Sequence, residues 1–175
     1  MHSSLSRIYR KLFCIGVAII VSFSCSGPDM PSAKGKVVAI ADGDTFTFLD
    51  KKNMQVKIRL YGVDCPERSQ EFGTVARQKL SDLIFGQPVK LVEKGTDQYG
   101  RTIAMVYTPN NVCVNEELLR NGLAWHYKEY DKNSRWAQLE EIARRNKVGL
   151  WSQPHPTPPW EWRKEKRMKQ METAK

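Results

Sequence analysis

Three short polar segments interrupt the apolar pattern of this sequence where strands are expected to end. Each alone is typical of an ordinary turn, and surface ion pairs would be the simplest explanation of their charges. Together they bring carboxylates and two arginines into loops, where functional side chains are commonly held by a rigid scaffold. The segments are Asp42-Gly43-Asp44-Thr45, then Arg59 followed by Asp64-Cys65-Pro66-Glu67, and Asp97-Gln98-Tyr99-Gly100-Arg101.

These groups suit the hydrolysis of a phosphodiester bond. A divalent cation held by carboxylates can bind a phosphoryl oxygen and orient the attacking water. Two guanidiniums can clamp the remaining oxygens in a bidentate way that lysine does not reproduce, and another carboxylate can accept a proton from water. A site built on loops from few oxygen ligands favours Ca²⁺ or Mg²⁺, and it tolerates the flexible geometry of Ca²⁺ better.

Alternating apolar residues predict five short strands to hold these loops. We expect them at residues 36–40, 45–49, 56–60, 89–92 and 102–107. In the third strand, Val56, Ile58 and Leu60 share one face, so Arg59 lies on the other face and is free to point at a ligand.

Helical periodicity predicts three helices. The first carries an inward stripe between residues 72 and 84 that includes Val75, with Ser69 as its N-cap and Gly86 as its stop. The second covers 115–120. The third covers 134–147, with Trp136, Leu139 and Ile142 facing inward. Five strands with a helix between the third and fourth is the order of an OB-fold barrel, a fold that often binds oligonucleotides. The fold class is therefore α+β, a five-stranded OB-fold β-barrel with three helices.

The chain is long enough for one domain with appendages. It has 175 residues, 41% hydrophobic and 27% charged. Basic residues at 7, 10 and 11 precede an apolar run at 12–23 that is typical of an export signal and short for a membrane span. Without residues 1–25 the chain keeps 25 basic and 19 acidic residues, so a charge of +6 still favours an acidic partner such as nucleic acid.

Cys25 follows the apolar run and precedes Ser26, Gly27 and Pro28, which resembles a bacterial lipoprotein cleavage site. The resemblance is incomplete, because Ser22 stands where such sites usually have leucine. We expect a lipidated Cys25 and a tether at 26–34; ordinary cleavage near residue 24, or an uncleaved anchor, is the alternative. The protein is then an exported lipoprotein on a membrane, or a secreted one.

Two other cysteines, Cys65 and Cys113, lie within the domain expected at 35–162. No Cys/His cluster suggests zinc, and we expect free thiols. Four prolines between 154 and 159 argue against a regular helix there, Trp160 and Trp162 are expected to dock back onto the domain, and residues 163–175 should form a frayed charged tail. That tail is more typical of a solvated end than of a nucleic-acid-binding arm.

The polar segments, taken in order, resemble the staphylococcal nuclease (thermonuclease) family. The resemblance runs from about residue 36 to 151 and also includes Pro-Pro-Trp-Glu-Trp-Arg at 158–163. The motifs that carry it are Asp-Gly-Asp-Thr at 42–45, Arg-Leu-Tyr-Gly-Val-Asp-Cys-Pro-Glu at 59–67, Asp-Gln-Tyr-Gly-Arg at 97–101 and Val-Asn-Glu-Glu-Leu-Leu-Arg-Asn-Gly-Leu-Ala at 114–124.

The resemblance implies a monomeric, metal-dependent phosphodiesterase with a single Ca²⁺, cleaving DNA and RNA as an endonuclease and exonuclease to give 3′-phosphate ends. Asp44 and Asp64 would bind the ion through carboxylates and Cys65, which replaces a threonine, through its backbone carbonyl. The resemblance further assigns the phosphate to Arg59 and Arg101, the general base to Glu67, and a substrate contact to Tyr99.

One further departure from the family and one further aromatic side chain bear on the substrate. Gln98 replaces a lysine that contacts substrate phosphate in the family, which would weaken binding. Tyr130 could stack on a base, whereas Trp125 and His126 are expected to be packing residues.

Two other classes of function are compatible with the fold. A non-catalytic oligonucleotide-binding OB-fold lipoprotein would have lost catalytic residues, and an adhesion lipoprotein would use the barrel as a scaffold. The five residues expected to bind the metal or the phosphate or to act as general base are all present, which argues against a loss of catalysis; they are Asp44, Arg59, Asp64, Glu67 and Arg101.

Overall fold

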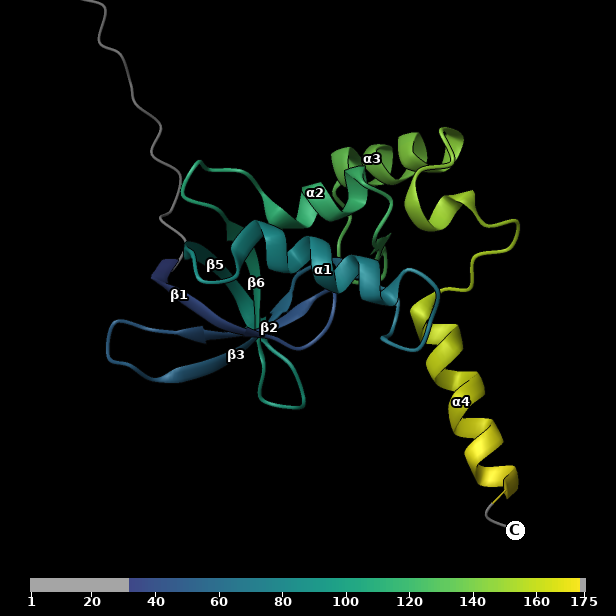
Figure 1. The fold of residues 1–175 in the computed structure, drawn as a ribbon, viewed down its shortest axis with the longest axis horizontal. Coiled ribbons are helices and arrows are strands. Elements are labelled where there is room, and N and C mark those ends of the chain that lie inside the picture. The colour runs from purple at the N-terminus through teal and green to yellow at the C-terminus, as the bar shows by residue number, and fades with distance from the viewer. Residues whose placement is uncertain (1–31, 174–175) are drawn as a thin grey trace, which may run out of the picture.

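The computed structural model of the chain describes residues 32–173, so the proposed signal at 1–25, Cys25 and most of the tether lie outside the described residues. Five strands close into a barrel in the order β1-β2-β3-β6-β5, and β5 pairs back onto β1 (Figure 1). All neighbours are antiparallel except β3 and β6, which are parallel. The strands are β1 (Ser32–Ile40), β2 (Thr45–Leu49), β3 (Gln55–Leu60), β5 (Pro88–Thr96) and β6 (Thr102–Tyr107).

The barrel forms because alternate residues of each strand are apolar and face inward. Phe46 and Phe48 of β2, Ile58 and Leu60 of β3, and their counterparts on the other strands are almost fully buried. This confirms the five-stranded barrel that the alternation predicts. Its last two strands start close to where expected, but β5 continues to Thr96.

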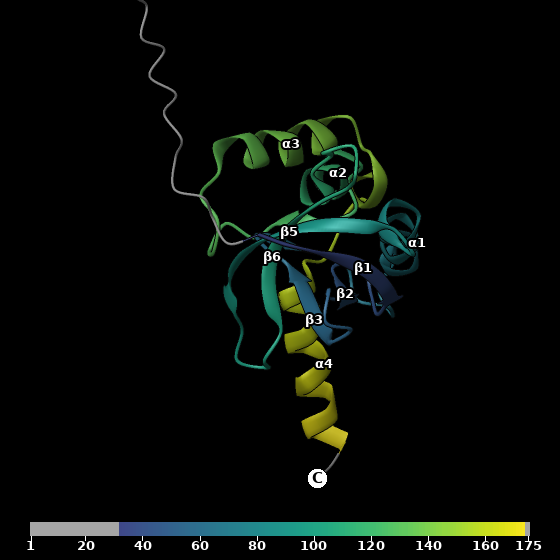
Figure 2. The same ribbon diagram turned by 90° about the vertical axis from the view of Figure 1, so that its left-hand side faces the viewer.

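Helices cover one side and one end of the barrel (Figures 1 and 2). A small second sheet pairs β4 (Val63–Asp64) with β7 (Trp125–His126). None of the helices among residues 32–173 combines the length and apolar character needed to cross a membrane. The helical elements are α1 (Gly73–Ile84), α2 (Val114–Arg120), α3 (Ser134–Arg145), the 3-10 turn η1 (Gly149–Ser152) and α4 (Pro159–Thr173).

The start of α1 differs from the expectation. Ser69 is not its N-cap, because the helix begins at Gly73 after Phe72, whose φ is +64°. The preceding loop folds against the helix start so closely that a Cβ on Gly73 would lie 1.9 Å from the Glu67 carbonyl oxygen. The residues before Gly73 are therefore a compact loop that carries Glu67 rather than a first helical turn.

Two residues expected to face inward do not. Val75 is 49% exposed and Ile142 is 48% exposed. In α1 the buried face is made by Ala76, Leu80 and Ile84 at intervals of four, and Val75 lies about 100° around the helix from Ala76. The helices bury a narrower stripe than the periodicity alone indicates.

The expectation of a frayed tail from residue 163 is wrong as far as residue 173, because α4 runs without interruption from Pro159. The described residues therefore contain four α-helices rather than three. Proline is well tolerated at the first helical position, where its missing N–H has no helical partner anyway. Glu161 lies in the first turn, where the helix dipole favours an acid, and the following residues are mostly good helix formers.

Only the beginning of α4 is docked on the body of the protein. Pro159 is buried, and Trp160 stacks on Tyr127 with ring centroids 5.4 Å apart and meets Trp125 edge-on at 5.6 Å. Trp160 thus docks as expected, and Trp162 is half-buried. The rest of the helix projects away from the barrel in both views (Figures 1 and 2).

Candidate active site

Strand register brings the first charged groups together at one end of the barrel. In the pairing of β2 with β3, Thr45 lies opposite Arg59, so Asp44 is adjacent to that arginine. In the parallel pairing of β3 with β6, Thr102 lies opposite Ile58, and Arg101 precedes this pair. The central strand β3 therefore has an acidic loop at the end of one neighbour and Arg101 at the end of the other.

Two glycines allow the remaining segment to reach the same place. Gly62 has a φ of +66° and turns the chain from β3 into β4, which carries Asp64. Gly43 is required for a different reason, since a Cβ there would lie 2.7 Å from the Cβ of Cys65. The backbone of the loop at Asp42–Asp44 therefore packs directly against the side chain of Cys65, in the segment after β4.

Arg59 joins the two most buried carboxylates. Its Nη1 lies 2.7 Å from Asp44 Oδ1, and its Nη2 lies 2.7 Å from Asp64 Oδ1. Asp44 is 3% exposed and Asp64 is fully buried. Burial raises the pKa of Asp44, with Arg59 opposing and Asp42 adding to the rise. Burial alone would lower the pKa of Arg59, but the two carboxylates raise it, so the guanidinium stays charged.

Cys65 contributes its backbone to the site. Its N–H donates to Asp44 Oδ2 at 3.0 Å, which fixes the loop after β4 to the loop before β2. Burial, together with the neighbouring carboxylates, raises the pKa of its thiol. Cys65 and Cys113 are both free thiols, as expected.

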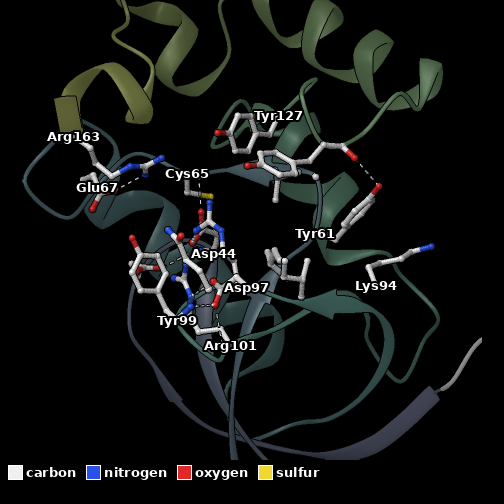
Figure 3. Close-up of a pocket in the computed structure, with 18 of the residues that line it drawn as sticks. Asp44, Tyr61, Cys65, Glu67, Lys94, Asp97, Tyr99, Arg101, Tyr127 and Arg163 are labelled. Carbon is white, nitrogen blue, oxygen red and sulfur yellow. Dashed lines mark hydrogen bonds and ion pairs between the residues drawn. The ribbon is translucent and has the colours of Figure 1, made fainter. Parts of the chain in front are cut away.

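Arg101 adjoins this cluster through Thr45, whose Oγ1 lies 3.4 Å from Arg101 Nη1 and donates to Asp44 Oδ1 at 3.0 Å. Its Nε donates to Asp97 Oδ2 at 2.7 Å, and its guanidinium lies 5.6 Å from the ring centroid of Tyr99. The cleft has a volume of about 700 Å³ and also receives Glu67 (Figure 3). Tyr99 and Tyr130 line it with 75% and 63% of their surface exposed, so their rings are available to a ligand.

Asp97 makes the loop around Arg101 sensitive to pH. Partial burial would raise its pKa, but the hydrogen bonds from the Arg101 backbone, the Arg101 side chain and the Tyr99 N–H lower it below the ordinary 3.8. A lowered folded-state pKa means that ionised Asp97 stabilises the fold above pH 3.8, and that this stability disappears as the pH falls through the lowered value.

We therefore expect Asp97→Ala to lower the free energy of unfolding at pH 7 by about 1 to 2 kcal/mol, through the lost charge-assisted hydrogen bonds. The difference from wild type should shrink steadily below pH 3.8. Urea unfolding of both proteins at pH 7 and near pH 3 measures it. An equal difference at both pH values would contradict this account.

Arg163 is a site residue that the sequence did not reveal. It enters from α4, and its Nη2 lies 2.7 Å from Asp64 Oδ2. Its Nη1 lies 2.8 Å from Glu67 Oε1, beside which it is seen in Figure 3. The motif at 158–163 drew attention to this segment, but no local pattern indicates which residues a distant helix will meet.

Asp44 and Asp64 are the side chains best placed to hold a cation. Within residues 32–173, no three acidic, histidine or cysteine side chains are grouped closely enough to hold a metal by themselves. Each of the two carboxylates accepts three hydrogen bonds from the described part of the chain, two on Oδ1 and one on Oδ2. A carboxylate offers roughly four lone-pair positions, so one position on each Oδ2 is left. Both groups can therefore still accept a cation.

The charge balance also fits a divalent ion. The guanidiniums of Arg59 and Arg163 pair with the carboxylates of residues 44, 64 and 67, and Asp42 lies beside Asp44 and accepts a hydrogen bond from its N–H. These four carboxylates carry two more formal charges than the two guanidiniums. Hard divalent ions such as Ca²⁺ and Mg²⁺ take oxygen ligands and keep water in their shells, so two carboxylates can form part of such a site.

Trp125 and His126 are packing residues, as expected. Trp125 meets Trp151 edge-on at 4.4 Å, and His126 is 3% exposed with its Nε2 2.8 Å from Asp131 Oδ2. Neither lines the cleft.

Comparison with known proteins shows that the chain is similar to nucleases. A sequence model of the family described as "Staphylococcal nuclease homologue" matches residues 57–153. The chain is 41% identical over 133 residues to a protein of Haemophilus influenzae named "Uncharacterized endonuclease", covering 76% of this chain and 74% of that one. It is 39% identical over 158 residues to "Micrococcal nuclease" of Shigella flexneri, covering 85% and 90%. It is 42% identical over 111 residues to "Staphylococcal-like nuclease CAN1" of Arabidopsis thaliana, covering 63% and 34%.

Proposed function

The chain belongs to the staphylococcal nuclease family, and from that premise we propose that it is a calcium-dependent nuclease that cleaves DNA and RNA to give 3′-phosphate ends. The observation that carries the proposal is the convergence of acidic and basic side chains from separate segments on one cleft. The residues that line it are Asp44, Arg59, Glu67 and Arg101, and the buried Asp64 lies behind it in contact with Arg59. Nuclease activity itself follows from the family. The metal, the substrates and the products are the proposal.

Asp44 and Asp64 would hold calcium through their carboxylates, and Cys65 through its backbone carbonyl. Bound there, the ion supplies positive charge to a phosphoryl oxygen and makes a bound water more acidic. The free lone-pair positions on both carboxylates and the surplus of two negative charges support this assignment.

Arg59 and Arg101 would bind the scissile phosphate. A guanidinium has five N–H donors. Arg59 uses two of them on Asp44 and Asp64, and Arg101 uses one on Asp97 and a second, at 3.4 Å, on Thr45. Each arginine therefore keeps donors for phosphate oxygens, and its acidic partners hold it in place before the substrate arrives. Preorganised charge of this kind stabilises a transition state without reorganisation.

Glu67 would accept the proton of the attacking water. Its side chain lies at the edge of the cleft and is 37% exposed, so water reaches it. Tyr99 and Tyr130 would stack on bases, an interaction that every base can make and that explains a substrate range of both DNA and RNA.

The place of action is part of the proposal. The basic and apolar pattern of residues 1–25 supports export, with attachment to a membrane through Cys25 or release after cleavage. Activity outside the cytoplasm would give the enzyme access to foreign or free nucleic acid, and we propose that it acts there as a monomer.

Digestion of labelled DNA and RNA by the purified protein tests the proposed function. Cleavage should require added calcium and stop with a calcium chelator. Polynucleotide kinase should label the 5′ ends of the fragments without prior phosphatase treatment, because 3′-phosphate products carry 5′-hydroxyls. Cleavage that continues in chelator would refute the calcium site, fragments with 5′-phosphates would refute the products, and binding without cleavage would favour the non-catalytic oligonucleotide-binding alternative.

A further inference from the structure

We propose that Arg163, on the C-terminal helix, is a positioning residue of the active site that holds Glu67 and Asp64 in their working arrangement. This inference rests on the proposed function of Glu67 as general base. The family match ends at residue 153, ten residues before Arg163, so neither that match nor the motifs within the barrel assign Arg163 a role.

The geometry of Arg163 is that of a bridge between two carboxylates. One guanidinium nitrogen lies 2.7 Å from Asp64 Oδ2, and the other lies 2.8 Å from Glu67 Oε1 and 3.3 Å from Asp64 Oδ1. The planar guanidinium presents several donors to both carboxylates in one fixed arrangement, which the flexible, compact ammonium group of lysine does not reproduce. The spacing of Asp64 and Glu67 is thereby set by a residue almost a hundred positions further along the chain.

Glu67 needs such a partner. It lies in the loop between β4 and α1 with an exposed edge, and in the described part of the chain its carboxylate is hydrogen-bonded by Arg163 alone. An exposed glutamate otherwise samples several rotamers, and a general base acts only when it is held within reach of its proton. The ion pair with Arg163 therefore restricts Glu67 to the side of the cleft where α4 begins (Figure 3).

The start of α4 is built to keep Arg163 in place. Gln70 accepts a hydrogen bond from the Glu67 N–H at 2.9 Å and donates to the Thr157 carbonyl at 3.0 Å, so one side chain ties the glutamate loop to the segment before α4. Trp160 stacks on Tyr127, which itself lines the cleft. The docked first turn of α4 is thus continuous with the site.

The inference is tested with the full-length protein and the variant Arg163→Ala, measured at saturating calcium. Loss of a residue that orients a catalytic group typically lowers activity about 10- to 100-fold. We expect this loss in kcat. KM for a short oligonucleotide should change less than about threefold, because in this proposal Arg163 acts on the two carboxylates and not on the substrate. Lys164→Ala, a change of the exposed neighbouring residue, should leave kcat unchanged. Methylguanidinium added to Arg163→Ala should restore part of kcat, and Arg163→Lys should remain impaired.

A double-mutant cycle shows whether Arg163 acts through Glu67. If it does, Arg163→Ala should cost little in the background of Glu67→Gln, so the two losses are far from additive. Near-ultraviolet circular dichroism reports whether Trp160 remains stacked, and Arg163→Lys replaces Arg163→Ala in every measurement if the alanine variant does not fold.

Three results would overturn the inference: wild-type kcat in Arg163→Ala, fully additive losses in the cycle, or higher activity with tighter calcium binding in isothermal titration, which would make Arg163 a competitor of the ion. Failure of the proposed function is a different result, because the wild-type protein would then be inactive as well.

Discussion

Replacing Arg101 with methionine should reduce kcat by about 10³- to 10⁵-fold, the range over which a positioned arginine accelerates phosphoryl transfer. The methionine keeps the aliphatic stem and removes only the donors and the charge. Arg101 and its partner Asp97 are 24% and 14% exposed, and ion pairs near the surface contribute about 0 to 1 kcal/mol. Turnover should therefore be lost with a free energy of unfolding close to that of wild type.

Single-turnover cleavage of a labelled oligonucleotide, together with urea unfolding, measures both quantities. Lys164→Met serves as the matched control, since it removes one exposed positive charge outside the cleft. A variant at Arg101 that cleaves at the wild-type rate would remove this residue from the mechanism, and the cleft would then need another source of transition-state charge.

The barrel was predictable because its information is local. Alternation in segments such as Val56–Lys57–Ile58–Arg59–Leu60 fixes both the strand and the face that Arg59 occupies, and the structure has Ile58 and Leu60 buried with Arg59 turned to the carboxylates. The strand register then brings loops that are distant in sequence close together in space. Because Thr45 lies opposite Arg59, the preceding residue Asp44 must lie next to Arg59. The structure brings every residue of the predicted site to one cleft apart from Asp64, which lies fully buried behind it. Their roles remain the proposal made above.

The parts that the sequence did not predict depend on contacts between distant segments. Four prolines argue locally against a helix, but a proline at the first helical position permits one, and α4 follows Pro159. Ser69 has the right chemistry for an N-cap, yet the chain around it forms a compact loop that closes on Gly73. The position of Arg163 could not be predicted for both reasons, because Arg163 reaches Asp64 and Glu67 only after α4 has formed and has docked on the domain.

Arg59→Met should have the same effect on turnover as Arg101→Met and a very different effect on stability. Arg59 is 17% exposed and is the shared partner of Asp44 and Asp64, which are almost completely buried. Removing one member of a buried ion pair costs about 3 to 5 kcal/mol, because the remaining charge is left without compensation. That is a large part of the 5 to 15 kcal/mol that typically separates folded from unfolded domains.

The two arginine variants together separate catalysis from structure. In chelator, urea unfolding should show Arg59→Met several kcal/mol less stable than Arg101→Met, and the additional change Asp44→Asn should recover part of the loss because it removes one unpaired charge. Calcium should stabilise Arg59→Met at least as strongly as wild type, since the ion takes over the missing positive charge; at a hundred times its Kd a bound ligand adds about 2.7 kcal/mol. Equal stability of the two variants without calcium would mean that Asp44 and Asp64 do not depend on Arg59 for compensation. In that case the buried pair would have to be held uncharged in the folded protein, and carboxylates in that state could not serve as ligands for a cation.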